Sequence, residues 1–157
     1  MPLRVGWVDD TALIRQLAVR LIERSGHTCR SFPRHVDLLE ADREEPFDVV
    51  VLQPEDAVPP HLTRKRLLAR SSRRAIALAS GHSIERLRDR LDADPTAFDH
   101  FLAKPFDPAA MTAWLARLDA MPMRASGSAP RPVMAQHIAQ GHLFEAPWIT
   151  LEVVVSS

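Results

Sequence analysis

The sequence predicts an α/β protein built on a doubly wound, five-stranded parallel sheet with helices on both faces. The first observation is that short apolar runs alternate with segments of helical periodicity between residues 3 and 118. The second is that the runs 49–52 and 75–79 are continuously apolar, as in strands buried on both faces of a parallel sheet. Together these features predict repeated strand–helix units that form one sheet.

The predicted elements follow one another along the chain with short connections. Strands are predicted at 3–8, 27–32, 47–52, 75–79 and 98–103. Most of these segments are short apolar runs that end in polar or turn residues. Helices are predicted at 11–25, from Val36 to Glu44, at 62–70, across 84–91 and at 107–118, where apolar residues recur at helical spacing.

Individual residues mark where some of these elements begin and end. Gly26 stands where a helix C-cap belongs. Asp107 is a predicted N-cap, with Pro108 at the first helical position. Trp7 and Trp114 lie on apolar faces and are expected in the core.

The chain divides into a domain and a C-terminal extension. Residues 1–119 form the predicted domain, and 120–132 read as a flexible or extended, proline-rich linker. In the extension at 133–157, a short helix at 133–144 and a strand at 148–155 are expected. Because an unpaired apolar strand invites aggregation, it should pair with an edge of the sheet, pack on a helix or pair with a second chain. The alternative is a disordered tail.

Composition and charge bound the setting in which the protein acts. Lys and Arg number 20, as do Asp and Glu, so the formal net charge is zero, and neither a membrane nor a nucleic acid is called for as a partner. The single cysteine, Cys29, excludes an intramolecular disulfide. With no secretory signal and no apolar run of spanning length, a cytoplasmic protein is expected.

Two further groups of residues are candidate sites. A basic run at 64–74 could meet an acidic partner or a phosphate backbone, but a solvated helix face is the commoner outcome. The run comprises Arg64, Lys65, Arg66, Arg70, Arg73 and Arg74. The seven histidines show no metal-ligand spacing.

Polar residues follow four of the predicted strands. In open parallel sheets the functional site lies beyond the carboxyl ends of the strands. The residues expected there are Asp9, Asp10, Gln53, Ser80 and Lys104.

The order of these residues resembles the receiver domain of response regulators, the CheY-like superfamily, over residues 3–118. The resemblance rests on Asp-Asp after the first strand, residues 48–52 before Gln53, Ser80-Gly81 and residues 101–106, which read FLAKPF. The gaps are 43 (53 − 10), 27 (80 − 53) and 24 (104 − 80). It implies a flavodoxin-like (βα)5 fold and a role in two-component or phosphorelay signalling.

The resemblance also implies roles for single residues. In the family, an acidic pair and a third aspartate hold Mg²⁺, and that aspartate accepts the phosphoryl group. Asp9 and Asp10 match the acidic pair, while Ser80 and Lys104 match the hydroxyl and lysine that grip the phosphoryl group. Phe101 matches the switch position, which is often aromatic.

Gln53 is the departure from the family pattern, because it stands where the phosphoaccepting aspartate belongs. A neutral amide cannot form an acyl phosphate, and the site totals about −1 where the family pattern gives about −2, so Mg²⁺ should bind weakly at best. No other cofactor is implied. Lys104 is expected to reach the Gln53 carbonyl oxygen or a carboxylate of Asp9 or Asp10.

These features predict a pseudo-receiver that acts by protein–protein interaction and is not an enzyme. Its expected partner is a histidine kinase, a response regulator or an effector, met through the last two helices and the fifth strand, and a homodimer is a further option. Two alternatives stay open: a working receiver phosphorylated on another carboxylate such as Asp56 or Asp10, and a purely structural dimerisation module.

Overall fold

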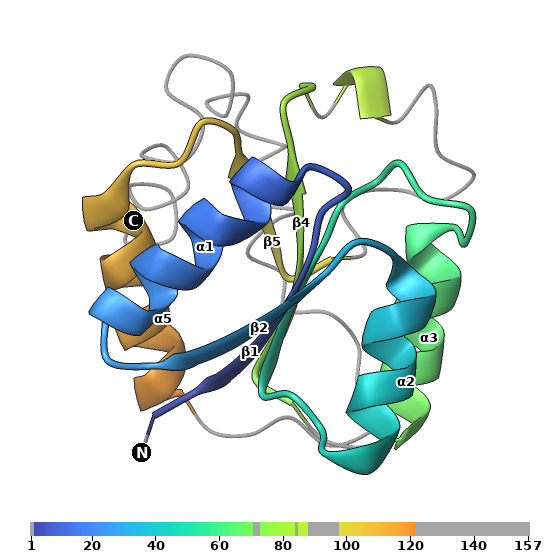
Figure 1. Cartoon of the computed structure of the whole chain (residues 1–157), viewed down its shortest axis with the longest axis horizontal. Helices are drawn as coiled ribbons and strands as arrows, with labels where there is room; N and C mark the ends of the chain where they lie inside the picture. The colour runs from blue at the N-terminus through green and yellow to red at the C-terminus, as the bar shows by residue number, and fades with distance from the viewer. Residues whose placement is uncertain (1, 71–72, 84, 88–97, 122–157) are drawn as a thin grey trace.

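The computed structural model describes residues 2–70, 73–83, 85–87 and 98–121, which form a sheet with helices on two sides (Figure 1). The strands of this part are β1 (Arg4–Val8), β2 (Thr28–Phe32), β3 (Val49–Leu52), β4 (Ala75–Ser80) and β5 (His100–Ala103). Its helices are α1 (Ala12–Arg24), α2 (His35–Glu44), α3 (Pro60–Arg70) and α5 (Pro108–Ala120).

The five strands form one parallel sheet in the order β2-β1-β3-β4-β5. Strand order therefore reverses beside β1, which pairs with β2 on one side and with β3 on the other. Helices α1 and α5 cover one face of the sheet, and α2 and α3 cover the other (Figure 1). The predicted doubly wound, flavodoxin-like sheet is confirmed.

The central strands and two tryptophans form the core, as the sequence predicts. All residues of β3 and β4 are buried, in line with their unbroken apolar runs. Trp7 and Trp114 are both buried, and the ring of Trp7 meets Phe106 edge to face at a centroid distance of 5.1 Å. This contact packs β1 against the segment that leads into α5.

Gly6 allows the opposite face of β1 to approach α2 closely. A Cβ atom added at Gly6 would lie 2.9 Å from Leu38 Cδ1 and 2.9 Å from Phe47 Cδ2. Both neighbours are themselves buried, so neither can give way without disturbing its own packing.

Two strands begin two residues later than predicted, and an aspartate stands directly before each of them. β3 and β5 begin at 49 and 100 rather than at 47 and 98. Asp48 Oδ2 accepts the amide of Arg4 at 2.8 Å, and Asp99 Oδ2 accepts the amide of Ile76 at 2.8 Å. These side chains bond the neighbouring strands just before β3 and β5 start. Helix α3 begins at Pro60, two residues earlier than predicted, since proline is well suited to the first turn of a helix.

The interpretation of residues 64–74 as a solvated basic face is wrong for Arg73. Its side chain is 1% exposed and donates to both carboxylate oxygens of Asp42, at 3.0 and 3.2 Å. It also donates to the carbonyls of Phe47 and Leu67. Arg73 therefore ties the end of α2 to the start of β4, while Lys65 and Arg66 lie exposed on α3.

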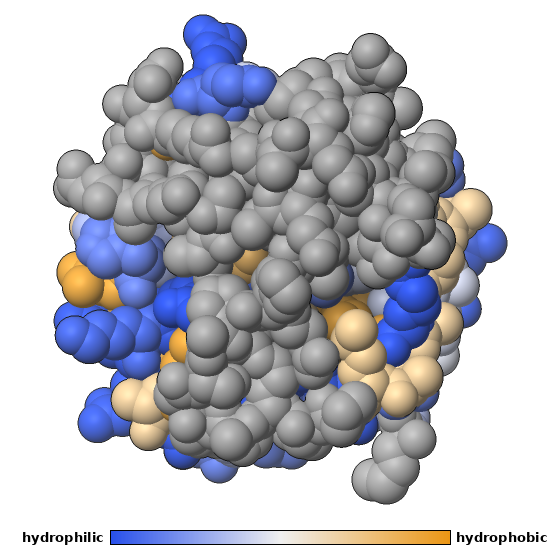
Figure 2. All heavy atoms as spheres, turned by 180° about the vertical axis from the view of Figure 1, so that it is seen from behind, coloured by the Kyte–Doolittle hydropathy of each residue, from blue (hydrophilic) through white to orange (hydrophobic). Residues whose placement is uncertain are grey.

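Several predicted segments fall outside the described residues. They are most of the fourth helix at 84–91 and the chain from 122 onward, which contains most of the linker, the short helix and the tail strand. Leu87, which is described, is buried. In the part of the chain that the structure describes, no helix is long and apolar enough to cross a membrane. From behind, hydrophilic and hydrophobic patches of the described surface lie side by side along both margins (Figure 2).

Candidate functional site

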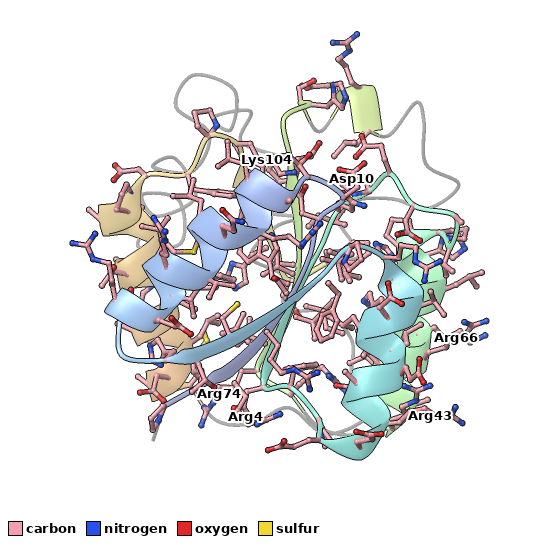
Figure 3. The ribbon with its side chains drawn as sticks, in the orientation of Figure 1. Arg4, Asp10, Arg43, Arg66, Arg74 and Lys104 are labelled. Atoms are coloured by element: carbon pink, nitrogen blue, oxygen red, sulfur yellow. The ribbon has the colours of Figure 1, made fainter. Side chains whose placement is uncertain are left out.

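The carboxyl ends of β1, β3, β4 and β5 gather the residues that the sequence predicts there. We call Asp9, Asp10, Gln53, Ser80 and Lys104 the strand-end site. Figure 3 shows Asp10 and Lys104 at the same end of the sheet, with Arg4 and Arg74 toward the opposite end. The strands are parallel and in register, so the residues that follow them converge although they are distant in sequence.

Asp9 and Lys104 form an ion pair at the centre of this site. Asp9 is 1% exposed and the Lys104 side chain 21% exposed. The Lys104 ammonium donates to Asp9 Oδ2, and Asp9 Oδ1 accepts the backbone amide of Thr11 at 2.9 Å. The prediction that Lys104 reaches Gln53, Asp9 or Asp10 is confirmed, and its partner is Asp9.

Gln53 lies directly after β3 and is 3% exposed. Its side-chain Oε1 accepts the backbone amide of Asp10 at 2.9 Å. Its backbone carbonyl accepts a hydrogen bond from His35 Nε2 at 2.8 Å. Gln53 therefore uses both of its carbonyl oxygens to connect the end of β3 with the start of the β1–α1 loop and with α2.

The remaining predicted residues occupy different environments. Asp10 is exposed, and its Oδ1 accepts from the Thr11 hydroxyl at 3.3 Å. Ser80 is buried; its Oγ accepts the amide of His82 at 3.0 Å, and its carbonyl accepts the amide of Lys104 at 2.9 Å. Phe101 is buried within β5. The acidic pair therefore divides into one buried and one exposed carboxylate.

Four residues that the sequence did not single out for these contacts also bear on the site. His35, the first residue of α2, has its Nδ1 2.9 Å from the hydroxyl of Thr63 in α3. Asp56 Oδ2 accepts the backbone amide of His35 at 3.0 Å, and the Arg15 guanidinium donates to the Asp9 carbonyl at 2.7 Å. Metal-ligand spacing among the histidines gives no sign of this role. The signal in the sequence is a histidine directly before the helix predicted from Val36.

The pKa of His35 is displaced by its surroundings. Burial lowers the pKa below its ordinary value, because the imidazolium would lose its hydration. The negative charge of Asp56 and the hydrogen bond to the Gln53 carbonyl act in the opposite direction, and the effect of burial is the larger.

The described side chains are a poor fit for the magnesium ion that the resemblance implies. Both carboxylate oxygens of Asp9 already have donors, and the amide oxygen of Gln53 is bonded to Asp10. Among the described residues, no three His, Cys, Asp or Glu side chains are grouped so that they could hold a metal ion. A hard divalent cation needs several anionic oxygens, and at this site Asp10 is the exposed carboxylate that remains.

The fold of the described residues is that of the receiver domains. Many solved structures match it; we describe three. The DrrB receiver domain activated with BeF3 is 20% identical, covers 77% of this chain and 100% of its own, and has a TM-score of 0.61. A CheY-like receiver domain from Methylobacillus flagellatus is 20% identical over 75% of this chain and 99% of its own, with a TM-score of 0.64.

A third structure shows a receiver domain with its metal. The receiver domain of the sensor histidine kinase PA1611 from Pseudomonas aeruginosa, with a magnesium ion coordinated in its active-site cleft, is 12% identical. It covers 77% of this chain and 100% of its own, with a TM-score of 0.63. Neither a protein-family model nor a curated protein matches the sequence.

Proposed function

We propose that the chain is a pseudo-receiver of the two-component or phosphorelay type, which acts by protein–protein contact without aspartyl phosphorylation. The observation that carries the proposal is Gln53, a buried amide at the carboxyl end of β3 whose oxygen is bonded to the Asp10 amide. Phosphoryl transfer to a side chain needs a nucleophilic oxygen, and a carboxamide does not supply one. We place this action in the cytoplasm.

The ion pair supports the same proposal. Lys104, which the resemblance assigns to the phosphoryl group, is neutralised by the buried carboxylate of Asp9. Such a pair is strongly held, because removing one partner leaves an uncompensated charge in the interior. The side chains of the strand-end site therefore bind one another, and the surface around the site is held in one conformation that a partner can recognise.

The alternative in which another carboxylate accepts the phosphoryl group fits Asp56 poorly. Asp56 Oδ2 accepts the amide of His35, and its Oδ1 accepts the amide of Val58 at 2.9 Å. Both oxygens of this carboxylate are used to hold the backbone. Asp10 is exposed and bonded only weakly to Thr11, so it is the carboxylate to examine if any phosphorylation is found.

Intact mass after incubation with acetyl phosphate and Mg²⁺ tests the proposal. The wild-type protein should gain no phosphoryl adduct, because position 53 lacks a carboxylate. Asp10→Asn is the matched variant for the remaining exposed carboxylate. An adduct on the wild type that disappears in Asp10→Asn would establish the working-receiver alternative and overturn the pseudo-receiver proposal.

The partner we expect is a histidine kinase, a response regulator or an effector; a membrane or nucleic-acid partner is not expected. The described part of the proposed contact face is β5 and α5, whose outer side carries the exposed residues Ala109, Ala113 and Ala116. A second copy of this chain, forming a homodimer, is the competing partner for this face. Light scattering of the full chain separates the two, since a homodimer formed through this face would have twice the mass of the monomer.

A further inference from the structure

His35 is a buried histidine in which both ring nitrogens and the backbone amide have partners. It is 0% exposed. Nε2 lies 2.8 Å from the Gln53 carbonyl, Nδ1 lies 2.9 Å from the Thr63 hydroxyl, and the amide donates to Asp56 Oδ2 at 3.0 Å. These contacts join α2, α3 and the loop that follows β3.

The partners of His35 determine its tautomer. A carbonyl oxygen can only accept, so Nε2 carries the proton that it donates to Gln53. In the neutral ring Nδ1 is then an acceptor, and the Thr63 hydroxyl donates to it. A second proton would have to go on Nδ1, which would turn Thr63 from donor to acceptor and place a charge in a fully buried position.

The loop held by His35 begins at Gln53, a residue of the strand-end site. We define the Gln53 loop as residues 53–58. It is fixed to His35 twice, through the Gln53 carbonyl and the Asp56 carboxylate. From the same loop, the Gln53 side chain reaches the Asp10 amide at 2.9 Å. A continuous chain of hydrogen bonds therefore runs from Thr63 through His35 and Gln53 to Asp10.

We infer that His35 is a positioning residue that locks the Gln53 loop to α2 and α3, and that the lock opens when the imidazole takes up a proton. The inference deepens the proposed function and rests on it, because it makes protonation, in place of phosphorylation, the signal that changes the site. It adds a role for a side chain that lies outside the strand-end site.

The charges around the imidazole are few in the described part of the chain. Asp56 faces it from the Gln53 loop and favours protonation. Arg34, the preceding residue, is exposed, pairs with Asp37 and also lies in the field of Asp56. The side chain that contacts the ring from α3 is the neutral Thr63. Burial outweighs Asp56, so the lock is closed at neutral pH and opens below it.

Amide hydrogen exchange at Asp10 tests the lock in the full chain. The probe is the protection of the Asp10 amide, expressed relative to that of Val51 in β3, which reports opening of the whole sheet. His35→Ala should lower this ratio about two- to tenfold at pH 7.5, the effect of weakening one hydrogen bond. The control is Leu39→Ala, which removes a buried α2 side chain and leaves the hydrogen bonds of Gln53 in place. It should not lower the ratio, because its loss of stability appears as opening of the whole sheet, which Val51 reports.

The pH profile and a conservative variant separate positioning from plain packing. In the wild type the ratio should hold at pH 7.5 and fall as the pH is lowered below about 6.5 and His35 is protonated. Nitrogen chemical shifts should show the proton on Nε2 at pH 7.5. In His35→Gln the side-chain amide can still donate to Gln53 but cannot titrate, so the ratio should stay high throughout. This variant also keeps the test decisive if His35→Ala does not fold.

Three results would overturn the inference: a proton on Nδ1 in the neutral ring, a ratio that His35→Ala leaves unchanged, or a pH profile that His35→Gln reproduces. Failure of the proposed function looks different. It would appear as a phosphoryl adduct on the wild-type chain, which can form whether or not His35 holds the loop.

Discussion

Placing a carboxylate at position 53 should make the stability of the strand-end site depend on magnesium. In Gln53→Asp the chain loses one buried methylene, about 0.8 kcal/mol, and the side-chain bond to the Asp10 amide, about 1 kcal/mol. It also places a charge at a position that is 3% exposed and close to the Asp9–Lys104 pair. An uncompensated charge at such a depth raises the total loss of unfolding free energy to about 3–5 kcal/mol.

Binding of magnesium should restore much of the unfolding free energy that Gln53→Asp loses. A ligand at 100 times its dissociation constant stabilises the folded state by about 2.7 kcal/mol. Urea unfolding of Gln53→Asp with and without Mg²⁺ measures the difference, with potassium chloride at equal ionic strength to correct for screening. The wild type should show no such response.

Gln53→Asn is the matched control, because it shortens the side chain equally and adds no charge. It should lose about 2 kcal/mol, the sum of the methylene and the hydrogen bond, and should not respond to Mg²⁺. The reasoning fails if Gln53→Asp is also indifferent to Mg²⁺, since the carboxylates of Asp9 and Asp10 would then not share a site with position 53.

Three further outcomes are expected from the structure. Arg73→Met should lower the unfolding free energy by about 3–5 kcal/mol, because it leaves Asp42 buried without its cation. The double variant Arg73→Met/Asp42→Asn should regain part of that free energy. If urea unfolding showed that the losses of the two single variants simply add, the pairing would be contradicted. Gly6→Ala should cost about 1–3 kcal/mol by overpacking, and an unchanged melting temperature would refute the close approach. Below about pH 6.5 a histidine in the unfolded chain binds a proton, whereas buried His35 in the folded chain resists protonation. The free energy of unfolding should therefore decrease as the pH is lowered, by at most about 1.4 kcal/mol per pH unit. His35→Gln should reduce this pH dependence. If the wild type and His35→Gln showed the same dependence, it would come from other groups.

The alternation of apolar runs and helical segments was enough to predict the parallel sheet and the residues at its carboxyl end. Burial on both faces imposes an unbroken apolar run on a central strand, as at 49–52 and 75–79, and that requirement is visible locally. Once the strands are parallel, their ends must converge. Asp9, Gln53, Ser80 and Lys104 could therefore be placed together without knowledge of their contacts.

The sequence could not decide which member of the acidic pair turns inward. Asp9 and Asp10 are neighbours with the same charge, and a strand end offers either side chain to the interior. The choice depends on Lys104, 95 residues away, whose ammonium needs a buried carboxylate. Asp9 is therefore buried while Asp10 stays in solvent.

The packing of α2 against α3 was decided only by the tertiary structure. It brings His35 to Thr63 across 28 residues, and Asp42 to Arg73 across 31. Local periodicity marks the apolar face of each helix but does not record which polar side chains will meet between helices. A buried polar group is stable only with a partner of matching geometry, so Arg73 and His35 acquire their roles from contacts that exist once the helices are in place.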